Sequence, residues 1–215
     1  MVFLLGEVGG AAAERLVSRG LGRMWTSKTP HLCRLDEPWG FDNGAFRDFI
    51  KGQPLDEYRF LRRLDLAYRV GRPLLAVTPD IVCGGTASLE YSVGWLKRLP
   101  PEWPWHLAVQ DGMRGEDVES VLPSFAGIFL GGSAGFKATS LYWCKMAHQY
   151  GKSFHYGRCG TTRKIREAQL IGCDSADSNV PVWIPGKFNQ LISALETYQP
   201  DLFGGFLEGQ PDPLG

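Results

Sequence analysis

The chain has 215 residues, of which 44% are hydrophobic and 21% charged, which is ordinary for one globular domain with a sizeable core. Lysine plus arginine and aspartate plus glutamate number 23 each, so no overall basic field attracts nucleic acid and any such contact must come from a local patch. Five cysteines form no Cys-x-x-Cys pair, which argues for reduced thiols and against a structural zinc. No apolar run reaches the roughly 18 residues of a membrane span, so we expect no membrane association and a cytoplasmic location.

Short apolar segments of strand length alternate with amphipathic segments of helix length along the chain. The expected strands lie at 2–6, 22–27, within 39–46 (the weakest of the set), 74–82, 106–112, 127–133, 153–156 and 173–178. The expected helices lie at 11–20, 56–71, 86–99, 115–124, 136–151, 161–172 and 188–198, before an irregular tail from about residue 201.

Strands that alternate with helices indicate a parallel sheet with right-handed crossovers. Eight such units predict a compact (β/α)8 TIM barrel, with residues 1–215 as a single domain. A doubly wound open sheet is the alternative. It is disfavoured as a dinucleotide-binding fold, because no Gly-x-Gly-x-x-Gly follows the first strand.

The segment 155–178 carries the densest pattern of the chain. A glycine-rich turn follows the strand at 153–156 and leads to a helix that Thr161 or Thr162 is expected to cap, because a hydroxyl satisfies one of the first N–H groups. Asp174 and Asp177 lie on the next short strand. Carboxylates at the carboxyl end of a barrel strand lie where barrel enzymes do chemistry. Two solvated loop acids are the alternative interpretation.

Other polar residues and glycines also follow expected strands. They are Asp42 in Phe41-Asp42-Asn43-Gly44-Ala45-Phe46, Asp80 in Thr78-Pro79-Asp80, Gln110 in Val109-Gln110-Asp111-Gly112, and Gly131 and Gly132 in Leu130-Gly131-Gly132-Ser133. Ordinary structural explanations exist for most of them: turn chemistry for Asp42, a helix cap for Asp80, and turn residues for the two glycines after the sixth strand. The four histidines show no metal-ligand spacing, so no metal is expected.

Together these segments resemble the catalytic barrel of the tRNA-guanine transglycosylases, in the same order over roughly residues 38–180. In that family a Gly-x-Gly turn leads through a helix to Gly-x-Asp-x-x-Asp; here the turn is Arg158-Cys159-Gly160 and the segment is 172–177. The segments at 42–46, 109–112 and 130–133 resemble the family's Asp-Ser-Gly-Gly-Phe, Val-Gln-Gly-Gly and Ile-Gly-Gly-Leu. Arg158 and Asp111 each replace a glycine of these patterns.

The resemblance implies a role for each matching residue. Asp177 would be the nucleophile and Asp42 the general acid/base. Asp80 would accept hydrogen bonds from the Watson–Crick edge of a guanine-like base, because a carboxylate offers two acceptors to two parallel donors. The remaining base-binding residues would be Phe46, which stacks on the base, Gln110, which reaches its carbonyl, Gly131 and Gly132, which approach it with their backbone, and Asp174.

The family's Cys-x-Cys-x-x-Cys…His zinc site and its tRNA-contacting insertions are missing from this sequence. Small zinc-less relatives include phage and bacterial enzymes that place 7-deazaguanines into DNA. The resemblance to that branch implies an enzyme that exchanges guanine in DNA for a free 7-deazaguanine base such as preQ0, without a cofactor and, if phage-encoded, in the host cytoplasm. The alternatives are a tRNA-directed enzyme of the same chemistry, a non-catalytic barrel that binds a base or a partner protein, and another barrel enzyme with a phosphate site at 131–133.

A DNA substrate needs basic residues near the site to hold phosphates. The candidates are Arg158, Arg163, Lys164 and Lys137, with Arg166 beside them. A solvated helix face is the alternative for this cluster. A partner protein that helps to grip DNA also remains open.

Overall fold

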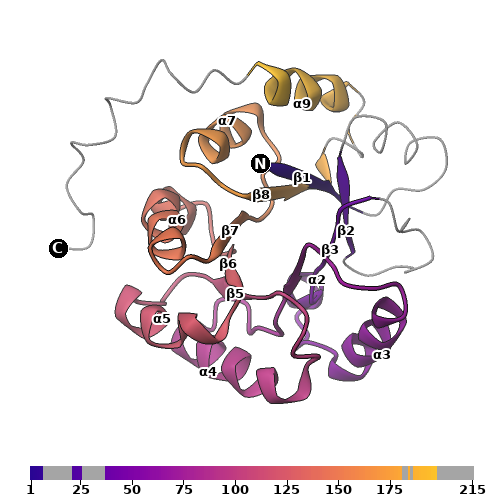
Figure 1. Ribbon diagram of the computed structural model, residues 1–215, viewed down its shortest axis with the longest axis vertical. Coiled ribbons are helices and arrows are strands. Elements are labelled where there is room, and N and C mark those ends of the chain that lie inside the picture. The colour runs from indigo at the N-terminus through magenta and orange to yellow at the C-terminus, as the bar shows by residue number, and fades with distance from the viewer. Residues whose placement is uncertain (7–20, 26–36, 181–183, 185, 198–215) are drawn as a thin grey trace.

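The computed structural model describes residues 1–6, 21–25, 37–180, 184 and 186–197. Eight parallel strands pair in sequence order, and the last pairs with the first, so that they close a barrel (Figure 1). The strands are β1 (Val2–Leu5), β2 (Gly22–Trp25), β3 (Trp39–Phe41), β4 (Leu75–Val77), β5 (Trp105–Val109), β6 (Gly127–Leu130), β7 (Ser153–Tyr156) and β8 (Ser175–Ser178). The predicted (β/α)8 barrel is therefore confirmed, and the open sheet is wrong.

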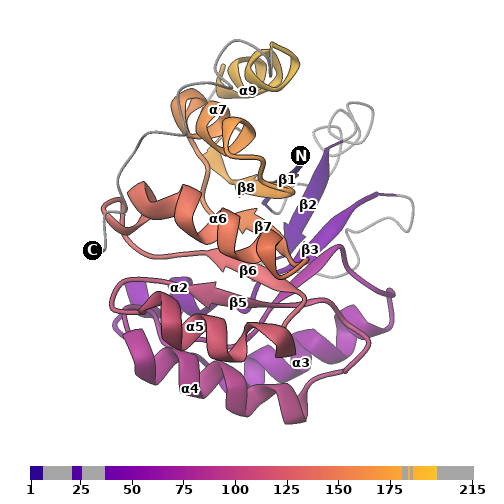
Figure 2. The same cartoon turned by 60° about the vertical axis from the view of Figure 1, so that its left-hand side comes forward.

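Helices surround this barrel, as two views of the ribbon show (Figures 1 and 2). The described α-helices are α2 (Ala45–Ile50), α3 (Glu57–Tyr68), α4 (Gly85–Trp95), α5 (Gly115–Val121), α6 (Ser140–Gln149), α7 (Thr162–Leu170) and α9 (Lys187–Glu196). Short 3-10 turns are η2 (Leu96–Arg98), η3 (Leu122–Ser124) and η4 (Phe136–Thr139). The helix expected at 11–20 and the tail expected from about 201 lie outside the described residues. No helix in the described part of the chain has the length and apolar character needed to cross a bilayer.

Apolar side chains fill both sides of the strands. Alternate strand residues point inward, so a narrow interior cluster forms from Leu4, Met24, Leu75, Val77 and Ala108. A β-carbon on Gly40 of β3 would lie only 2.8 Å from Met24 Sδ and 2.9 Å from Leu4 Cδ1, so only glycine fits there. Outside, an aromatic cluster lies under α3 and α4, and a larger cluster lies under α5, α6, α7 and α9.

The strands end earlier than expected. β4 stops at Val77 rather than at residue 82, because Pro79 has no N–H to donate to a neighbouring strand. β5 stops at Val109, and the unexpected short helix α2 follows β3. Thr161 caps α7 by accepting a hydrogen bond from the Lys164 N–H at 3.3 Å, which confirms one of the two capping residues that were expected. These early ends place the polar residues that follow β3, β4 and β5 at the rim of the barrel.

Candidate active site

Four sequence-predicted site residues meet at the carboxyl end of the barrel. Asp42 directly follows β3, Asp80 lies three residues after β4, Gln110 directly follows β5, and Asp177 belongs to β8. All strands are parallel, so their carboxyl ends share one rim. The negative charge of Asp177 raises the pKa of Asp42, that of Asp42 raises the pKa of Asp80, and Gln110 donates a hydrogen bond to Asp80. These residues therefore form one cluster, although they come from four different strands.

Asp80 is buried and held at both oxygens. Asn43 Nδ2 donates to its Oδ1 at 2.7 Å, and Gln110 Nε2 donates to its Oδ2 at 3.2 Å. Asn43 also donates to the Thr78 carbonyl at 2.6 Å, which ties the end of β3 to the end of β4. Burial raises the pKa of Asp80 to about 7, a rise to which the nearby charge of Asp42 adds and which the two hydrogen bonds oppose.

Gln110 is buried, and both the nitrogen and the oxygen of its side-chain amide form hydrogen bonds within the protein. Its nitrogen also donates to Ser88 Oγ at 2.7 Å and to the Ile81 carbonyl at 3.0 Å, while its oxygen accepts from the Cys83 N–H at 2.6 Å. In this conformation Gln110 positions Asp80 and the start of α4. Its expected reach to a base carbonyl stays a prediction that would require these contacts to rearrange.

Asp177 is anchored through one carboxylate oxygen. Its Oδ1 accepts from His155 Nε2 at 3.0 Å and from the Arg158 backbone N–H at 3.0 Å. The described residues give Oδ2 no hydrogen-bond donor, and 13% of the side chain is exposed. Two donors thus fix one carboxylate oxygen, while the other accepts no hydrogen bond from the described residues.

His155 is the site residue that the sequence analysis missed. It is fully buried, stacks on Phe129 at 4.9 Å between ring centroids, and places its Nδ1 2.8 Å from Ser175 Oγ. A hydrogen-bonded chain therefore runs from Ser175 through His155 to Asp177, inside the barrel. The alternation of side chains along a strand could have pointed to it. Every second residue of β7 and its extension, namely Ser153, His155 and Gly157, shares the inward face.

Asp42 is held by its backbone as well as by its side chain. The Arg63 guanidinium, from α3, donates to the Asp42 carbonyl at 2.9 Å and to the Trp25 carbonyl at 3.2 Å. The carboxylate accepts from the Gly44 N–H at 2.9 Å. Asp42 keeps part of its surface accessible, yet desolvation raises its pKa to about 6; Gly44 opposes the rise, and the charge of Asp177 adds to it.

Phe46 and Arg158 face each other at this rim. The Phe46 ring is 40% exposed, and the Arg158 guanidinium carbon lies 4.0 Å from its centroid. The same guanidinium donates to the Gly132 carbonyl at 2.6 Å. Arg158 was expected to contact nucleic-acid phosphates, and in this conformation it folds over the ring that was expected to stack on a base.

Gly131 and Gly132 form the turn after β6. The Gly131 N–H donates to the Val109 carbonyl at 2.9 Å, so it is already used. Gly132 has a φ of +71°, and a β-carbon there would lie 2.8 Å from Asp111 Oδ2. Asp111 in turn accepts from Ser133 N and Ser133 Oγ, each at 2.6 Å, and although burial opposes ionisation these bonds lower its pKa. The Asp111 carboxylate therefore holds the turn at 131–133 through two hydrogen bonds from Ser133.

Asp174 does not belong to this site, and the prediction that it binds the base is wrong. It precedes β8, and its Oδ2 accepts from the Phe154 N–H at 2.7 Å and from His148 Nε2 at 3.0 Å. Three residues of extended chain separate it from Asp177, which is about 10 Å at roughly 3.3 Å per residue. It thus lies at the amino end of the barrel, because the strand begins after Asp174 and not before it.

Lys137 is buried, and its predicted role in holding phosphates is wrong. Only 3% of its surface is exposed. Its ammonium donates to the Gly157 carbonyl and, at 3.4 Å, to the Leu130 carbonyl, and it lies 5.0 Å from the Tyr156 ring centroid. Burial lowers its pKa to about 7, with the positive charge of Arg158 adding to the effect. Lys137 thus links the ends of β6 and β7.

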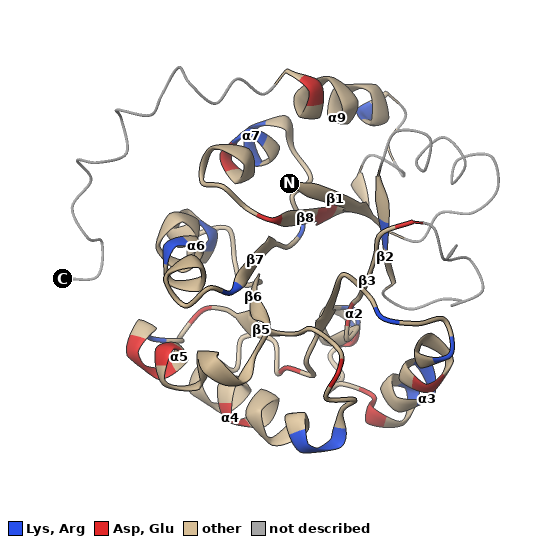
Figure 3. Ribbon diagram, in the orientation of Figure 1, with Lys and Arg blue, Asp and Glu red and all other residues tan. Residues whose placement is uncertain are grey.

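Arg163 and Lys164 lie in the first turn of α7, the helix that follows β7. Arg163 is exposed, Lys164 is half-buried, and Arg166 is exposed further along. Figure 3 shows blue stretches of lysine and arginine along α7. Arg163 and Lys164 therefore lie at the end of α7 that begins on the carboxyl side of β7, the side on which Asp42 and Asp177 lie.

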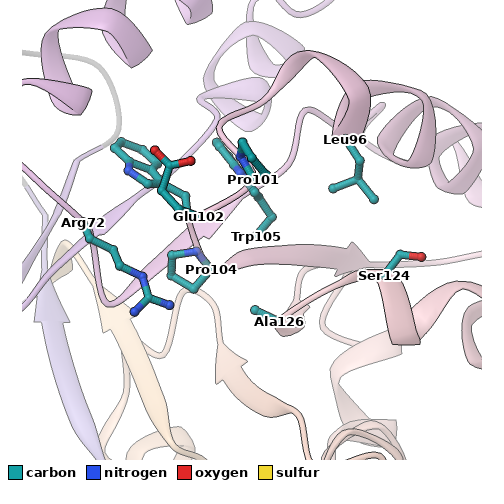
Figure 4. Close-up of a pocket in the computed structure, with 9 residues that line it drawn as sticks. Arg72, Leu96, Pro101, Glu102, Pro104, Trp105, Ser124 and Ala126 are labelled. Carbon is teal, nitrogen blue, oxygen red and sulfur yellow. The ribbon is translucent and has the colours of Figure 1, made fainter.

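A hollow of about 360 Å³ lies at the other end of the barrel (Figure 4). It is lined by residues that precede or begin strands, namely Arg72, Leu96, Pro101, Glu102, Trp103, Pro104, Trp105, Ser124 and Ala126. None of the sequence-predicted site residues lines it. Because barrel enzymes carry their chemistry at the carboxyl end, the carboxylate cluster and not this hollow is the candidate active site.

Within the described residues, no group of three or more histidines, cysteines and carboxylates is arranged to hold a metal ion. No protein-family model and no curated protein matches this chain.

Proposed function

We propose that the protein is a transglycosylase that exchanges guanine in DNA for a free 7-deazaguanine base. The observation that carries the proposal is the pairing of Asp42 and Asp177 at the mouth of the barrel, beside the buried acid Asp80. Two carboxyl groups with different environments suit a double displacement at a sugar carbon, in which one attacks and the other handles protons. The order of the site segments resembles that of the guanine transglycosylases.

In the first half-reaction, Asp177 Oδ2 attacks C1′ of the nucleotide. The bond from C1′ to N9 of guanine breaks, its electron pair stays with the base, and protonated Asp42 supplies the proton. Its pKa of about 6 leaves a usable fraction of the acid form near neutral pH. Asp177 is then an ester of the sugar.

In the second half-reaction, the incoming base gives its N9 proton to Asp42 and attacks C1′. The ester bond breaks and Asp177 regains its charge, so protons and electrons balance over the cycle. His155 and the Arg158 N–H hold Oδ1 in place throughout. A target base within a duplex must first leave the stack.

Asp80 supports the choice of a guanine-like base. Each of its oxygens already accepts one hydrogen bond, and each keeps a second lone pair. Two parallel acceptors match the N1–H and 2-amino donors of guanine and of 7-deazaguanines. Phe46 supplies an exposed aromatic face at the same rim.

The direct test is mass spectrometry of nucleosides. Duplex DNA and, separately, tRNA are incubated with the protein and 7-cyano-7-deazaguanine, then digested. We expect the modified deoxynucleoside from DNA and release of an equal amount of guanine. Modification of tRNA alone would assign the protein to the RNA-directed alternative, and modification of neither, together with no binding of the base, would leave the non-catalytic barrel that binds a partner protein.

A further inference from the structure

We propose that the Arg158 side chain is a removable plug in the base-binding place. Its guanidinium occupies the face of Phe46, and a bound base displaces it outward, where it holds a phosphate of the nucleic acid. The inference rests on the proposed function and assigns Arg158 two alternate duties.

The contacts of the guanidinium are those that a planar base would make. Its carbon lies 4.0 Å from the Phe46 centroid, and it donates to the Gly132 carbonyl at 2.6 Å. Guanidinium groups are planar and stack on aromatic faces as bases do. A base that stacks on this face of Phe46 must therefore move Arg158 aside.

The backbone of Arg158 is held separately from its side chain. Its φ of +54° is left-handed, a conformation that, among the described residues, only Cys83 and Arg158 adopt without being glycine. This conformation directs the Arg158 N–H to Asp177 Oδ1 at 3.0 Å. The side chain can thus swing while the backbone keeps the nucleophile in place. Left-handed backbone disfavours residues that have a β-carbon, so an arginine at this position suggests that its side chain has a function.

The surrounding charges favour the inward position. The positive charge of Arg158 acts on the carboxyl groups of Asp42, Asp80 and Asp111. A phosphate offers the guanidinium a stronger, bidentate partner than the single Gly132 carbonyl. A phosphate of nucleic acid bound at the mouth therefore favours the outward position of the Arg158 side chain and leaves the face of Phe46 to the base.

The test compares Arg158→Gly with wild type by calorimetry. Glycine tolerates the left-handed backbone and keeps the N–H that Asp177 needs, so only the side chain is lost. We expect 7-cyano-7-deazaguanine to bind roughly five- to fiftyfold more tightly to the variant, the scale of one stacked cation and one hydrogen bond together. A DNA duplex should bind more weakly. Arg158→Asn, which also tolerates this backbone, should behave in the same way.

Two controls isolate the plug. Arg163→Ala removes a nearby charge that does not contact Phe46, and should weaken DNA binding while leaving base affinity unchanged. Phe46→Leu removes the stacking face, so adding Arg158→Gly to it should give no further gain in base affinity.

The outcomes separate the inference from the proposed function. If wild type binds the base and Arg158→Gly binds it equally or more weakly, Arg158 is a wall of the pocket and the plug is refuted while the function stands. If neither protein binds the base, both proposals fail.

Discussion

Both hydrogen bonds to the Asp177 carboxylate end on Oδ1, and the described residues give Oδ2 no donor, which decides what a substitution should do. Asp177→Asn retains an oxygen that accepts from His155 and the Arg158 N–H, but loses the negative charge that, in the proposed reaction, attacks C1′. We expect base exchange to fall by about 10⁴-fold or more while affinity for the free base stays nearly unchanged. Wild type that is denatured during turnover should carry a covalent DNA adduct, seen by gel shift, which the variant lacks.

Asp174→Asn is the matched control for this experiment. The same change at the amino end of the barrel removes a charge that faces His148 and the Phe154 N–H, far from the mouth. Exchange should continue at close to the wild-type rate. An Asp177→Asn protein that exchanges bases as fast as wild type would move the nucleophile to another residue.

If Asp80 reads the base as proposed, base binding should depend on pH. Its pKa of about 7, raised by burial, means that the carboxyl group is largely protonated below neutral pH. The proposal assigns the two hydrogen-bond acceptors to the ionised form, so we expect base binding to release a proton. Affinity should fall about tenfold for each pH unit below 7 and level off above roughly pH 8, as calorimetry would measure.

Asp80→Asn should bind the base weakly and without this pH dependence, because its amide does not titrate. A wild-type affinity that is flat between pH 5.5 and 8 would exclude Asp80 as the reader of the base.

At the scale of elements, Lys137 joins the carboxyl ends of β6 and β7. Lys137→Met keeps the apolar volume but leaves the Gly157 carbonyl without its donor, which should lower the free energy of unfolding by about 1–2 kcal/mol at pH 7. The pKa of Lys137 is lowered to about 7 by burial, so between pH 7 and 10 the unfolded chain binds more protons than the folded one. Wild-type stability therefore gains from this group as pH rises through that range.

Urea unfolding at pH 7 and pH 9 checks this prediction. The variant should lack the gain, so the difference between the two proteins widens at pH 9. Lys152→Met, which removes a solvent-exposed hydrogen bond to the Pro123 carbonyl, should cost little at either pH. Parallel pH profiles for wild type and Lys137→Met would contradict a buried amine with a depressed pKa.

At the scale of the whole molecule, the chain has zero net charge, so the proposed binding to DNA would depend on a local basic patch. The first turns of α7 supply one, with Arg163 and Arg166 exposed and Lys164 half-buried. Each phosphate contact that is lost should reduce the slope of log K against log salt by about 0.9. The double variant Arg163→Ala, Arg166→Ala should thus make this negative slope shallower by about two. It should also weaken binding to all DNA sequences alike, as fluorescence anisotropy would measure. Arg69→Ala with Arg72→Ala, before β4, should leave the slope unchanged.

The alternation of strands and helices was readable from the sequence, because the periodicity of apolar residues records which face each element buries. It predicted the closed barrel. Hydroxyl chemistry left Thr161 and Thr162 as candidates for the cap of α7, and the structure uses Thr161. The positions of Asp42, Asp80, Gln110 and Asp177 at strand ends predicted that they meet at one rim, since parallel strands place their carboxyl ends together. The alternation did not predict α2, because six residues of helix after a turn leave too short a pattern.

Which way each side chain points, and what it contacts, was decided by the tertiary structure. Asp174 and Asp177 are alike in sequence, yet a strand that starts at Ser175 puts them at opposite ends of the barrel. In the sequence Lys137 resembles a surface cation, yet in the structure its buried ammonium donates to the Leu130 carbonyl of β6 and to the Gly157 carbonyl that follows β7. His155 has its partner 22 residues away on the neighbouring strand, and the register of the β7–β8 pair, with His155 opposite Ser175, brings the two together. The order of helices and strands could be predicted from the sequence, because burial patterns are local. Which polar and charged groups contact each other depended on the fold, because these contacts join residues far apart in the chain.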